Sequence, residues 1–302
     1  MTNAVPAPVT VAIISLDSSH AVEFVRRMQA ADCPEENRVP GLRAKTFLRF
    51  PSAYQREDGQ DKRQAQLEAW GVVKAPDLAA AVAGVDGIMM IINDPAPHRE
   101  WFERIADFGK PVFIDKPLAS SIADAVAIAT MAKQRGLRVS SASSLRSDAP
   151  LRHACAEIPH PTSVSVYGHV GVAPAGSSLV WYGVHSVEML ERAMGRGAVA
   201  VSARRDAEGV VAVVDYADRR RGVVELSASG YLYGGTLRDS SKAVSFAVDS
   251  NSCYSAQLRE VERFFRGGEG PATLDSALEV TAILDAIERS YQTGGATQAV
   301  YQ

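Results

Sequence analysis

Pro111-Val112-Phe113-Ile114-Asp115-Lys116-Pro117 joins a short apolar run to a charged pair and a proline. An apolar run of this length, bounded by prolines, predicts a strand that is buried in a sheet. Ligands of open parallel sheets bind beyond the carboxyl ends of the strands. Lys116 is therefore expected to mark the active centre.

Short Val/Ile-rich runs alternate with helical patterns on both sides of this segment. Strands are expected at residues 9–16, 42–48, 87–92, 111–114 and 137–141. Helices are expected at residues 21–30, 62–70, 78–83, 99–108 and 122–134. Continuous apolar runs are typical of strands that are buried on both faces. Residues 1–142 are therefore predicted to form an α/β domain with a Rossmann-type, doubly wound parallel sheet.

After about residue 143 the apolar residues alternate with polar ones, and hairpin-like turns separate the runs. Strands are expected at residues 163–166, 198–203, 210–216, 223–228 and 243–248. The chain is expected to finish in helices, where Ala277, Val280, Leu284, Ile287 and Tyr291 recur at helical spacing. Residues 143–302 are thus predicted to form an α+β domain with a largely antiparallel open sheet. Its uncovered face favours a homodimer or homotetramer.

Composition excludes several classes of protein. The 302 residues carry a net charge of -3, so no basic field favours nucleic acid or an anionic membrane. The start of the chain, Met1-Thr2-Asn3-Ala4-Val5-Pro6, has no basic stretch, and the apolar run after it is too short for a membrane span. Cys33, Cys155 and Cys253 lie far apart, as expected of free thiols in the cytoplasm, and no metal site is indicated.

Polar residues follow three of the predicted strands. Asp17-Ser18-Ser19-His20 comes after Leu16, Asn93-Asp94-Pro95-Ala96-Pro97-His98 comes after Ile92, and Asp115-Lys116-Pro117 comes after Ile114. Because the carboxyl ends of parallel strands meet at one edge of a sheet, all three segments should open onto one crevice.

The segment Asp115-Lys116-Pro117-Leu118-Ala119 lies between a predicted strand and a predicted helix. It resembles the Gfo/Idh/MocA family of glucose-fructose oxidoreductases and inositol dehydrogenases, which has Glu-Lys-Pro as its signature at this position. A second segment, Tyr182-Gly183-Val184-His185-Ser186-Val187-Glu188, is similar to the family's Gly-x-His-x-x-Asp segment. The resemblance extends over most of the chain. It includes Gly84-Val85-Asp86-Gly87 and Gly109-Lys110-Pro111-Val112.

This resemblance implies an NAD(P)-dependent dehydrogenase that acts on a hydroxyl or carbonyl group of a sugar, cyclitol or related small molecule. Lys116 would polarise the substrate oxygen and His185 would be the general base, with Tyr182 or Glu188 orienting the imidazole or relaying its proton. The expected cofactor-binding residues are Leu16, Asp17, Ser18, Ser19, His20, Arg49, Asn93, Pro95, His98, Asp115 and Lys116. The expected substrate-binding residues are Lys116, Arg146, Trp181, Tyr182, His185 and Tyr231.

Several positions depart from the family pattern. The glycine positions of the usual Gly-x-Gly-x-x-Gly/Ala turn hold Ser15, Asp17 and His20. Asp17 either places a carboxylate where a cofactor's pyrophosphate would lie or caps the following helix. Arg49 suits the 2'-phosphate of NADP, which is favoured over NAD, or is a solvated arginine. Trp181 stands where the family's acidic residue is expected.

These departures leave a second function open. The chain would then be a family member without net redox turnover, either a lyase or isomerase or a ligand-binding regulatory protein.

Overall fold

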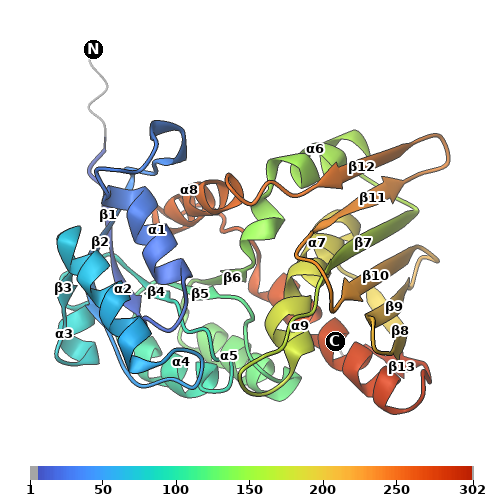
Figure 1. Ribbon diagram of the computed structural model, residues 1–302, viewed down its shortest axis with the longest axis horizontal. Coiled ribbons are helices and arrows are strands. Elements are labelled where there is room, and N and C mark those ends of the chain that lie inside the picture. Colours follow the sequence, from blue (N-terminus) through green and yellow to red (C-terminus); the bar gives the residue numbers. More distant parts are fainter. Residues whose placement is uncertain (1–5, 301–302) are drawn as a thin grey trace.

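A computed structural model describes residues 6–300, so Met1–Val5, Tyr301 and Gln302 lie outside the described residues. The chain forms two sheets with helices around and between them (Figure 1). The first sheet has six parallel strands in the order β3-β2-β1-β4-β5-β6. Its strands are β1 (Val9–Ile14), β2 (Leu42–Leu48), β3 (Val73–Lys74), β4 (Gly87–Met90), β5 (Val112–Asp115) and β6 (Val139–Ala142).

Helices cover both faces of this sheet, as the doubly wound prediction requires. They are α1 (His20–Gln29), α2 (Glu57–Ala69), α3 (Leu78–Val82), α4 (His98–Ala106) and α5 (Ile122–Gln134). One apolar core lies on each face. Ile13 and Phe24 belong to the core under α1, whereas Ile14 and Phe102 belong to the core under α4. The predicted Rossmann fold is confirmed.

The strand order reverses between β1 and β4. From β1 the chain runs outward through β2 to β3, and it then crosses back to β4 on the other side of β1. The loops after β1 and β4 therefore diverge and leave a crevice at their carboxyl ends, which is where dinucleotide-binding sheets hold their ligands. The fold places the three polar segments at this crevice.

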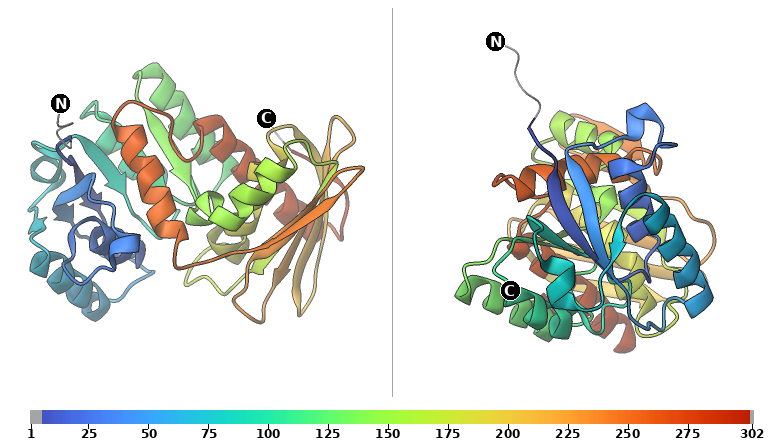
Figure 2. Two further views of the ribbon diagram at one scale, coloured as in Figure 1. Left: turned by 90° about the horizontal axis from the view of Figure 1, so that it is seen from above. Right: turned by 90° about the vertical axis from the view of Figure 1, so that its left-hand side faces the viewer.

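The second sheet has seven strands in the order β12-β11-β7-β10-β9-β8-β13, and β7 and β10 form a parallel pair within it. Its strands are β7 (Ser163–His169), β8 (Ala198–Arg205), β9 (Gly209–Tyr216), β10 (Arg221–Ser227), β11 (Gly234–Arg238), β12 (Ala243–Ala247) and β13 (Gln298–Ala299). Helices α6 (Ala149–Glu157), α7 (Val184–Met194) and α9 (Leu274–Gln292) pack against one face (Figure 2). Val210 and Val214 are buried on that face, and Val211 is half exposed on the other. The mostly antiparallel second sheet is thus confirmed. The predicted dimer or tetramer stays a prediction.

One closing helix returns to the first half of the chain. Helix α8 (Cys253–Phe265) packs on α1, and Leu258, Val261 and Phe264 join the core under α1. The expected division after residue 142 stays a prediction, but α8 contributes to the core of the first sheet. Its position brings Tyr254 to the crevice.

A buried ion cluster lies within the second half of the chain, next to the crevice. Arg146 lies in a 3-10 turn, η2 (Ser144–Ser147), and pairs with Glu191 and with Glu188 at 3.4 Å on α7. Its Nε also donates to the carbonyl oxygen of Pro271. Burial raises the pKa of Glu188 to about 7, in spite of the nearby Arg146 charge. No described helix, within residues 6–300, is long and apolar enough to cross a membrane.

Replacing Arg146 by methionine should destabilise the fold, because it leaves two buried carboxylates without their cation. Breaking a buried pair in this way costs about 3–5 kcal/mol. Urea unfolding followed by circular dichroism measures the loss. Arg152→Ala, on the exposed side of α6, is the control and should leave the free energy of unfolding unchanged. Equal stability of Arg146→Met and wild type would show that the cluster does not stabilise the fold.

Candidate active site

A small cavity of about 140 Å³ lies between the carboxyl ends of the first sheet's strands and the second half of the chain. It brings together Ser18, Ser19, His20, Asn93, Lys116, Trp181, Tyr182, His185 and Tyr231, all named from the sequence. Six further residues line it, namely Ser144, Leu145, Tyr233, Ser250, Cys253 and Tyr254. No carboxylate is among the lining residues, so the cavity is rich in hydrogen-bond donors.

Lys116 supplies the cavity's ammonium group. It follows β5 directly and is only 5% exposed. Across residues 6–300 its Nζ has no hydrogen-bond or ion-pair partner, so the group is available to a ligand. Burial lowers the pKa of Lys116, and the charges of Asp115 and Asp17 oppose that shift.

His185 enters the cavity from the first turn of α7. A π-helical turn, η3 (Leu179–Gly183), precedes α7 and sets the direction of the Trp181 and Tyr182 side chains. The Nδ1 atom of His185 lies 2.6 Å from the Ser143 Oγ. Burial and the charge of Lys116 hold the pKa of His185 well below its usual range. His185 is therefore a neutral imidazole at pH 7.

The contacts of Glu188 differ from the sequence prediction. Its carboxylate accepts from the Ser143 backbone N–H and pairs with Arg146, and it has no contact with His185. Ser143, which the sequence analysis did not single out, orients the imidazole instead. Arg146 is also not a substrate ligand, because its guanidinium is occupied by the two glutamates and Pro271 and does not line the cavity.

Asp17 is buried and fully engaged inside the protein. Its carboxylate accepts from the Ser15 and Ser52 hydroxyls, both at 2.7 Å, and from the backbone N–H groups of Asn93 and Asp94. Ser15 has φ of 84°, the left-handed conformation that a glycine would adopt at this position. Asp17 does not cap α1 with its side chain. It ties together the loops that follow β1, β2 and β4.

The loop after β2 also reaches the second half of the chain. The Tyr54 hydroxyl donates to the carbonyl oxygen of Ala175, and the Tyr54 ring meets the Trp181 ring edge-on, with ring centroids 5.4 Å apart. The Trp181 Nε1 donates to the Asn93 Oδ1 at 3.0 Å. Trp181 therefore fills the usual acidic position with an indole that links the two halves. No local sequence pattern indicates these contacts of Tyr54.

Arg49, His98 and Pro95 lie outside the cavity. The guanidinium of Arg49 pairs with Glu57 and Asp61 on α2, so it is not free for a 2'-phosphate. His98 is fully buried, with one ring nitrogen near the Ile92 carbonyl and the other near the Leu118 carbonyl. Its role is to hold these two loops together. The carbonyl of Leu16 accepts from Arg63, and that of Pro95 accepts from the His98 N–H.

Asp115 and His20 form a buried pair beside Lys116. The His20 Nδ1 lies 2.7 Å from the Asp115 Oδ2, and the His20 Nε2 lies 3.2 Å from the Tyr254 hydroxyl. Burial alone would raise the pKa of Asp115, but the contact with His20 and the charge of Lys116 outweigh it and the net shift is downward. Asp115 is therefore ionised. Tyr254 was missed because it comes from α8, more than two hundred residues away in the sequence.

Cys253 also lines the cavity, next to Tyr254. Burial raises the pKa of its thiol to about 11, so at neutral pH it is an uncharged thiol and a poor nucleophile. Within the described part of the chain no group of His, Cys, Asp and Glu side chains could hold a metal ion.

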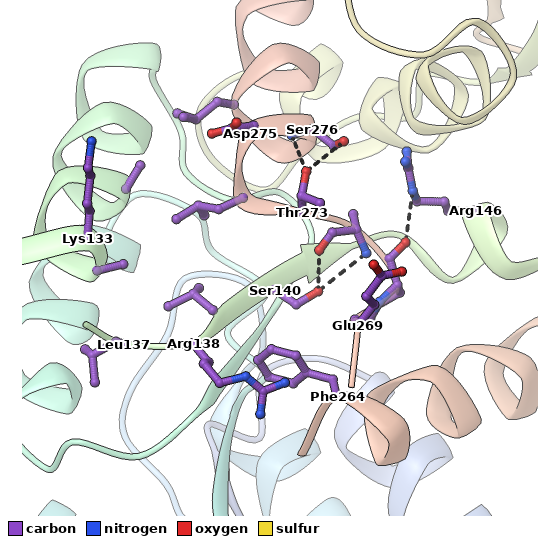
Figure 3. Close-up of a pocket in the computed structure, with 18 of the residues that line it drawn as sticks. Lys133, Leu137, Arg138, Ser140, Arg146, Phe264, Glu269, Thr273, Asp275 and Ser276 are labelled. Carbon is purple, nitrogen blue, oxygen red and sulfur yellow. Dashed lines mark hydrogen bonds between the residues drawn. The ribbon is translucent and has the colours of Figure 1, made fainter. Parts of the chain in front are cut away.

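A larger depression lies elsewhere. It measures about 880 Å³ and runs along β6 between α5 and the start of α9 (Figure 3). The polar groups in Figure 3 mostly bond to one another, with the Ser140 hydroxyl on the Ala272 carbonyl and Thr273 on Ser276. Because Lys116 and His185 are not among its lining residues, we assign the chemistry to the small cavity.

Residues 54–143 match a family described as "Oxidoreductase family, NAD-binding Rossmann fold". No curated protein sequence matches the chain.

Solved structures share the fold over nearly the whole length. GenD2 from gentamicin A biosynthesis, solved with NAD, is 18% identical and covers 98% of this chain and 97% of its own, with a TM-score of 0.78. A myo-inositol dehydrogenase from Corynebacterium glutamicum is 15% identical, with coverage of 98% and 99% and a TM-score of 0.79. The scyllo-inositol dehydrogenase from Lactobacillus casei, with NAD(H) and scyllo-inositol, is 13% identical, with coverage of 97% and 99% and a TM-score of 0.77. The match over residues 54–143 gives this segment the NAD-binding Rossmann fold of the Gfo/Idh/MocA oxidoreductases, and the solved structures show that the whole chain has the same fold as theirs.

Proposed function

We propose that the protein is an NAD(P)-dependent dehydrogenase that acts on a CH–OH group of a small polyhydroxylated compound such as a sugar or cyclitol. One observation carries the proposal: an unpaired ammonium group, Lys116, and a neutral imidazole, His185, face one cavity at the switch point of a Rossmann sheet. An alcohol loses a proton as it loses hydride. A cation beside the developing alkoxide and an imidazole that exchanges protons lower the same barrier.

The residues at the switch point fit the nicotinamide end of a cofactor. The loops after β1 and β4 diverge there, and Asn93 and Lys116 lie at the mouth of the cavity. The left-handed Ser15 keeps the tight turn that a dinucleotide needs. When bound, the nicotinamide would accept or supply the hydride. Because Arg49 pairs with acidic residues of the chain, it does not favour NADP over NAD, and either coenzyme is a candidate.

The pyrophosphate end fits less well. Asp17 places a negative charge at the second glycine position, and the backbone N–H groups of Asn93 and Asp94 are bound to its carboxylate. A dinucleotide must approach this carboxylate closely, and two anions at short range repel each other. We therefore propose that Asp17 weakens dinucleotide binding.

Lys116 and the tyrosines define what the cavity can hold. The ammonium donates to the reacting oxygen and stabilises negative charge on it, while Tyr182, Tyr231 and Tyr233 offer hydroxyls to the other oxygens of a polyol. A volume of about 140 Å³ restricts the cavity to a small compound.

A second function is favoured by Asp17 alone. If its carboxylate excludes the dinucleotide, the same cavity would support proton transfer without net redox change, as in a lyase or isomerase, or ligand binding without turnover.

Thermal melting with NAD, NADH, NADP and NADPH separates the two functions. A cofactor present at 100 times its dissociation constant stabilises the folded state by about 2.7 kcal/mol. We expect at least one of the four to raise the melting temperature, and absorbance at 340 nm with myo-inositol, scyllo-inositol and common aldoses then identifies the substrate class. No shift with any coenzyme, for protein shown by the spectrum of its denatured supernatant to carry none, would reject the dehydrogenase and leave the second function.

Replacing Asp17 by serine should tighten dinucleotide binding, because it removes the charge that opposes the pyrophosphate. Isothermal titration measures the dissociation constant for the coenzyme that binds wild type best. Asp94→Asn is the matched control, because it removes a neighbouring carboxylate that the Asp17 network does not use as an acceptor. Unchanged or weaker binding by Asp17→Ser would show that Asp17 does not oppose the cofactor.

The protonation of Lys116 should determine the alkaline limb of the pH profile of kcat/KM. Because burial lowers its pKa, kcat/KM should fall as the pH rises, at a pH below the ordinary lysine value of 10.5. Lys116→Arg, which stays charged, should lack this limb. Lys116→Met should lose about 100-fold or more in kcat at neutral pH. An unchanged limb in Lys116→Arg would assign it to another group.

A further inference from the structure

Two imidazoles face the cavity, and their partners differ. His185 touches the hydroxyl of Ser143, which is neutral, whereas His20 touches the carboxylate of Asp115. Hydrogen-bond partners fix which ring nitrogen carries the proton, and therefore whether the other nitrogen can accept one. The two rings can be assigned separately from their contacts.

His185 is assigned as a donor toward the cavity. The Ser143 hydroxyl is fully buried, and it accepts the backbone N–H of Leu145 at 3.2 Å. Within residues 6–300 the only acceptor near the Ser143 proton is the Nδ1 of His185, at 2.6 Å. A buried hydroxyl proton without an acceptor is costly, so Ser143 donates to Nδ1. The ring proton of His185 then sits on Nε2.

His20 is assigned the opposite tautomer. The ionised carboxylate of Asp115 can only accept, so the His20 Nδ1 carries a proton and donates it. Its Nε2 then has a free lone pair, which accepts from the Tyr254 hydroxyl at 3.2 Å. Burial raises the pKa of Tyr254, so this hydroxyl keeps its proton and can donate it. Asp115, His20 and Tyr254 form a chain that ends at the cavity.

We propose that His20, acting through Tyr254, is the proton acceptor of the reaction, and that Lys116 and His185 are the two donors that hold the reacting oxygen. Asp115 is a positioning residue that fixes the tautomer of His20 and balances the charge it gains. The proposal rests on the dehydrogenase function and deepens it, because it moves the base from His185 to a residue in the altered glycine turn.

The proton step balances without an outside reagent. The O–H bond of the substrate breaks and its proton passes to the Tyr254 oxygen, while the proton of Tyr254 passes to the His20 Nε2. Both electrons of the carbon–hydrogen bond leave with the hydride, which the oxidised nicotinamide cofactor of the proposed function would accept, and the substrate oxygen forms the carbonyl. His20 becomes an imidazolium beside the Asp115 carboxylate, which stabilises the positive charge.

The position of His20 explains why the glycine turn could change here. In a turn that contacts a pyrophosphate, the third glycine position allows close packing of helix and strand. An imidazole at this position reaches the Asp115 carboxylate on β5 and packs on Phe24 and Tyr254, with ring centroids 5.3 and 5.1 Å away. The side chain is thus directed across the crevice and not out to solvent.

Nitrogen-15 NMR of histidine-labelled wild-type protein tests the tautomers without a substrate. At a pH where both rings are neutral, we expect the His20 proton on Nδ1 and the His185 proton on Nε2. Signals are assigned with His20→Asn and His185→Asn. The reverse pair of tautomers would overturn the proposal, whether or not any compound turns over.

Kinetics with the best compound of the inositol and aldose panel test the role of the relay. His20→Ala and Tyr254→Phe should each lower kcat by about 100-fold or more, a typical share for general base catalysis. Added imidazole should restore activity to His20→Ala, because the substitution leaves room for it beside Asp115, and a purely structural role would give no such rescue. Asp115→Asn should also lower kcat.

Two matched controls keep the kinetic result specific. Tyr291→Phe and His160→Ala change the same residue types outside the cavity and should leave kcat unchanged. Full activity in folded Tyr254→Phe, or a larger loss with imidazole rescue in His185→Ala than in His20→Ala, would return the base to His185. If wild type turns over no compound with either coenzyme, the dehydrogenase function fails and the NMR result alone decides the relay.

Discussion

The carboxylate of Asp17 controls the shape of the crevice. It accepts hydrogen bonds from three separate loops, those that follow β1, β2 and β4. A buried carboxylate is costly unless hydrogen-bond donors surround it, so the three loops pack around Asp17. The loop after β2 is then placed where Tyr54 reaches across to Ala175 and Trp181. The Asp17 side chain, at a position where the family pattern has glycine, thus helps to link the two halves of the chain.

The remaining buried charges are arranged around this fixed point. Asp115 is balanced by His20 on one side and by the Lys116 charge on the other. Arg146 balances two glutamates behind the cavity, away from its lining. Lys116 directs its charge into the cavity. The concentration of donors around a small volume, with no lining carboxylate, favours a ligand that develops negative charge on oxygen.

The two changes in the glycine turn act on different parts of the site. Asp17 faces the loops and opposes a pyrophosphate, whereas His20 faces Asp115 and Tyr254 and adds an acceptor to the cavity. A turn of glycines offers backbone N–H groups to a cofactor, and this turn offers side chains to its neighbours and to a substrate. In the proposed mechanism the altered turn takes part in proton transfer as well as opposing the cofactor.

Local patterns in the sequence determined the fold. Run length, periodicity and turn residues predicted five of the six parallel strands within a few residues, because burial on both faces of a sheet constrains each segment separately. The short, exposed edge strand β3 was missed. The rule that ligands bind at carboxyl ends then gathered Ser18, His20, Asn93 and Lys116 around one crevice. The tertiary structure alone decided the partners of these groups. Ser143, Tyr54 and Tyr254 come from distant segments, and a hydrogen bond between such segments leaves no local pattern. For this reason Arg146 and Arg49 were assigned to ligands, and Glu188 to His185, although all three bond elsewhere within the chain.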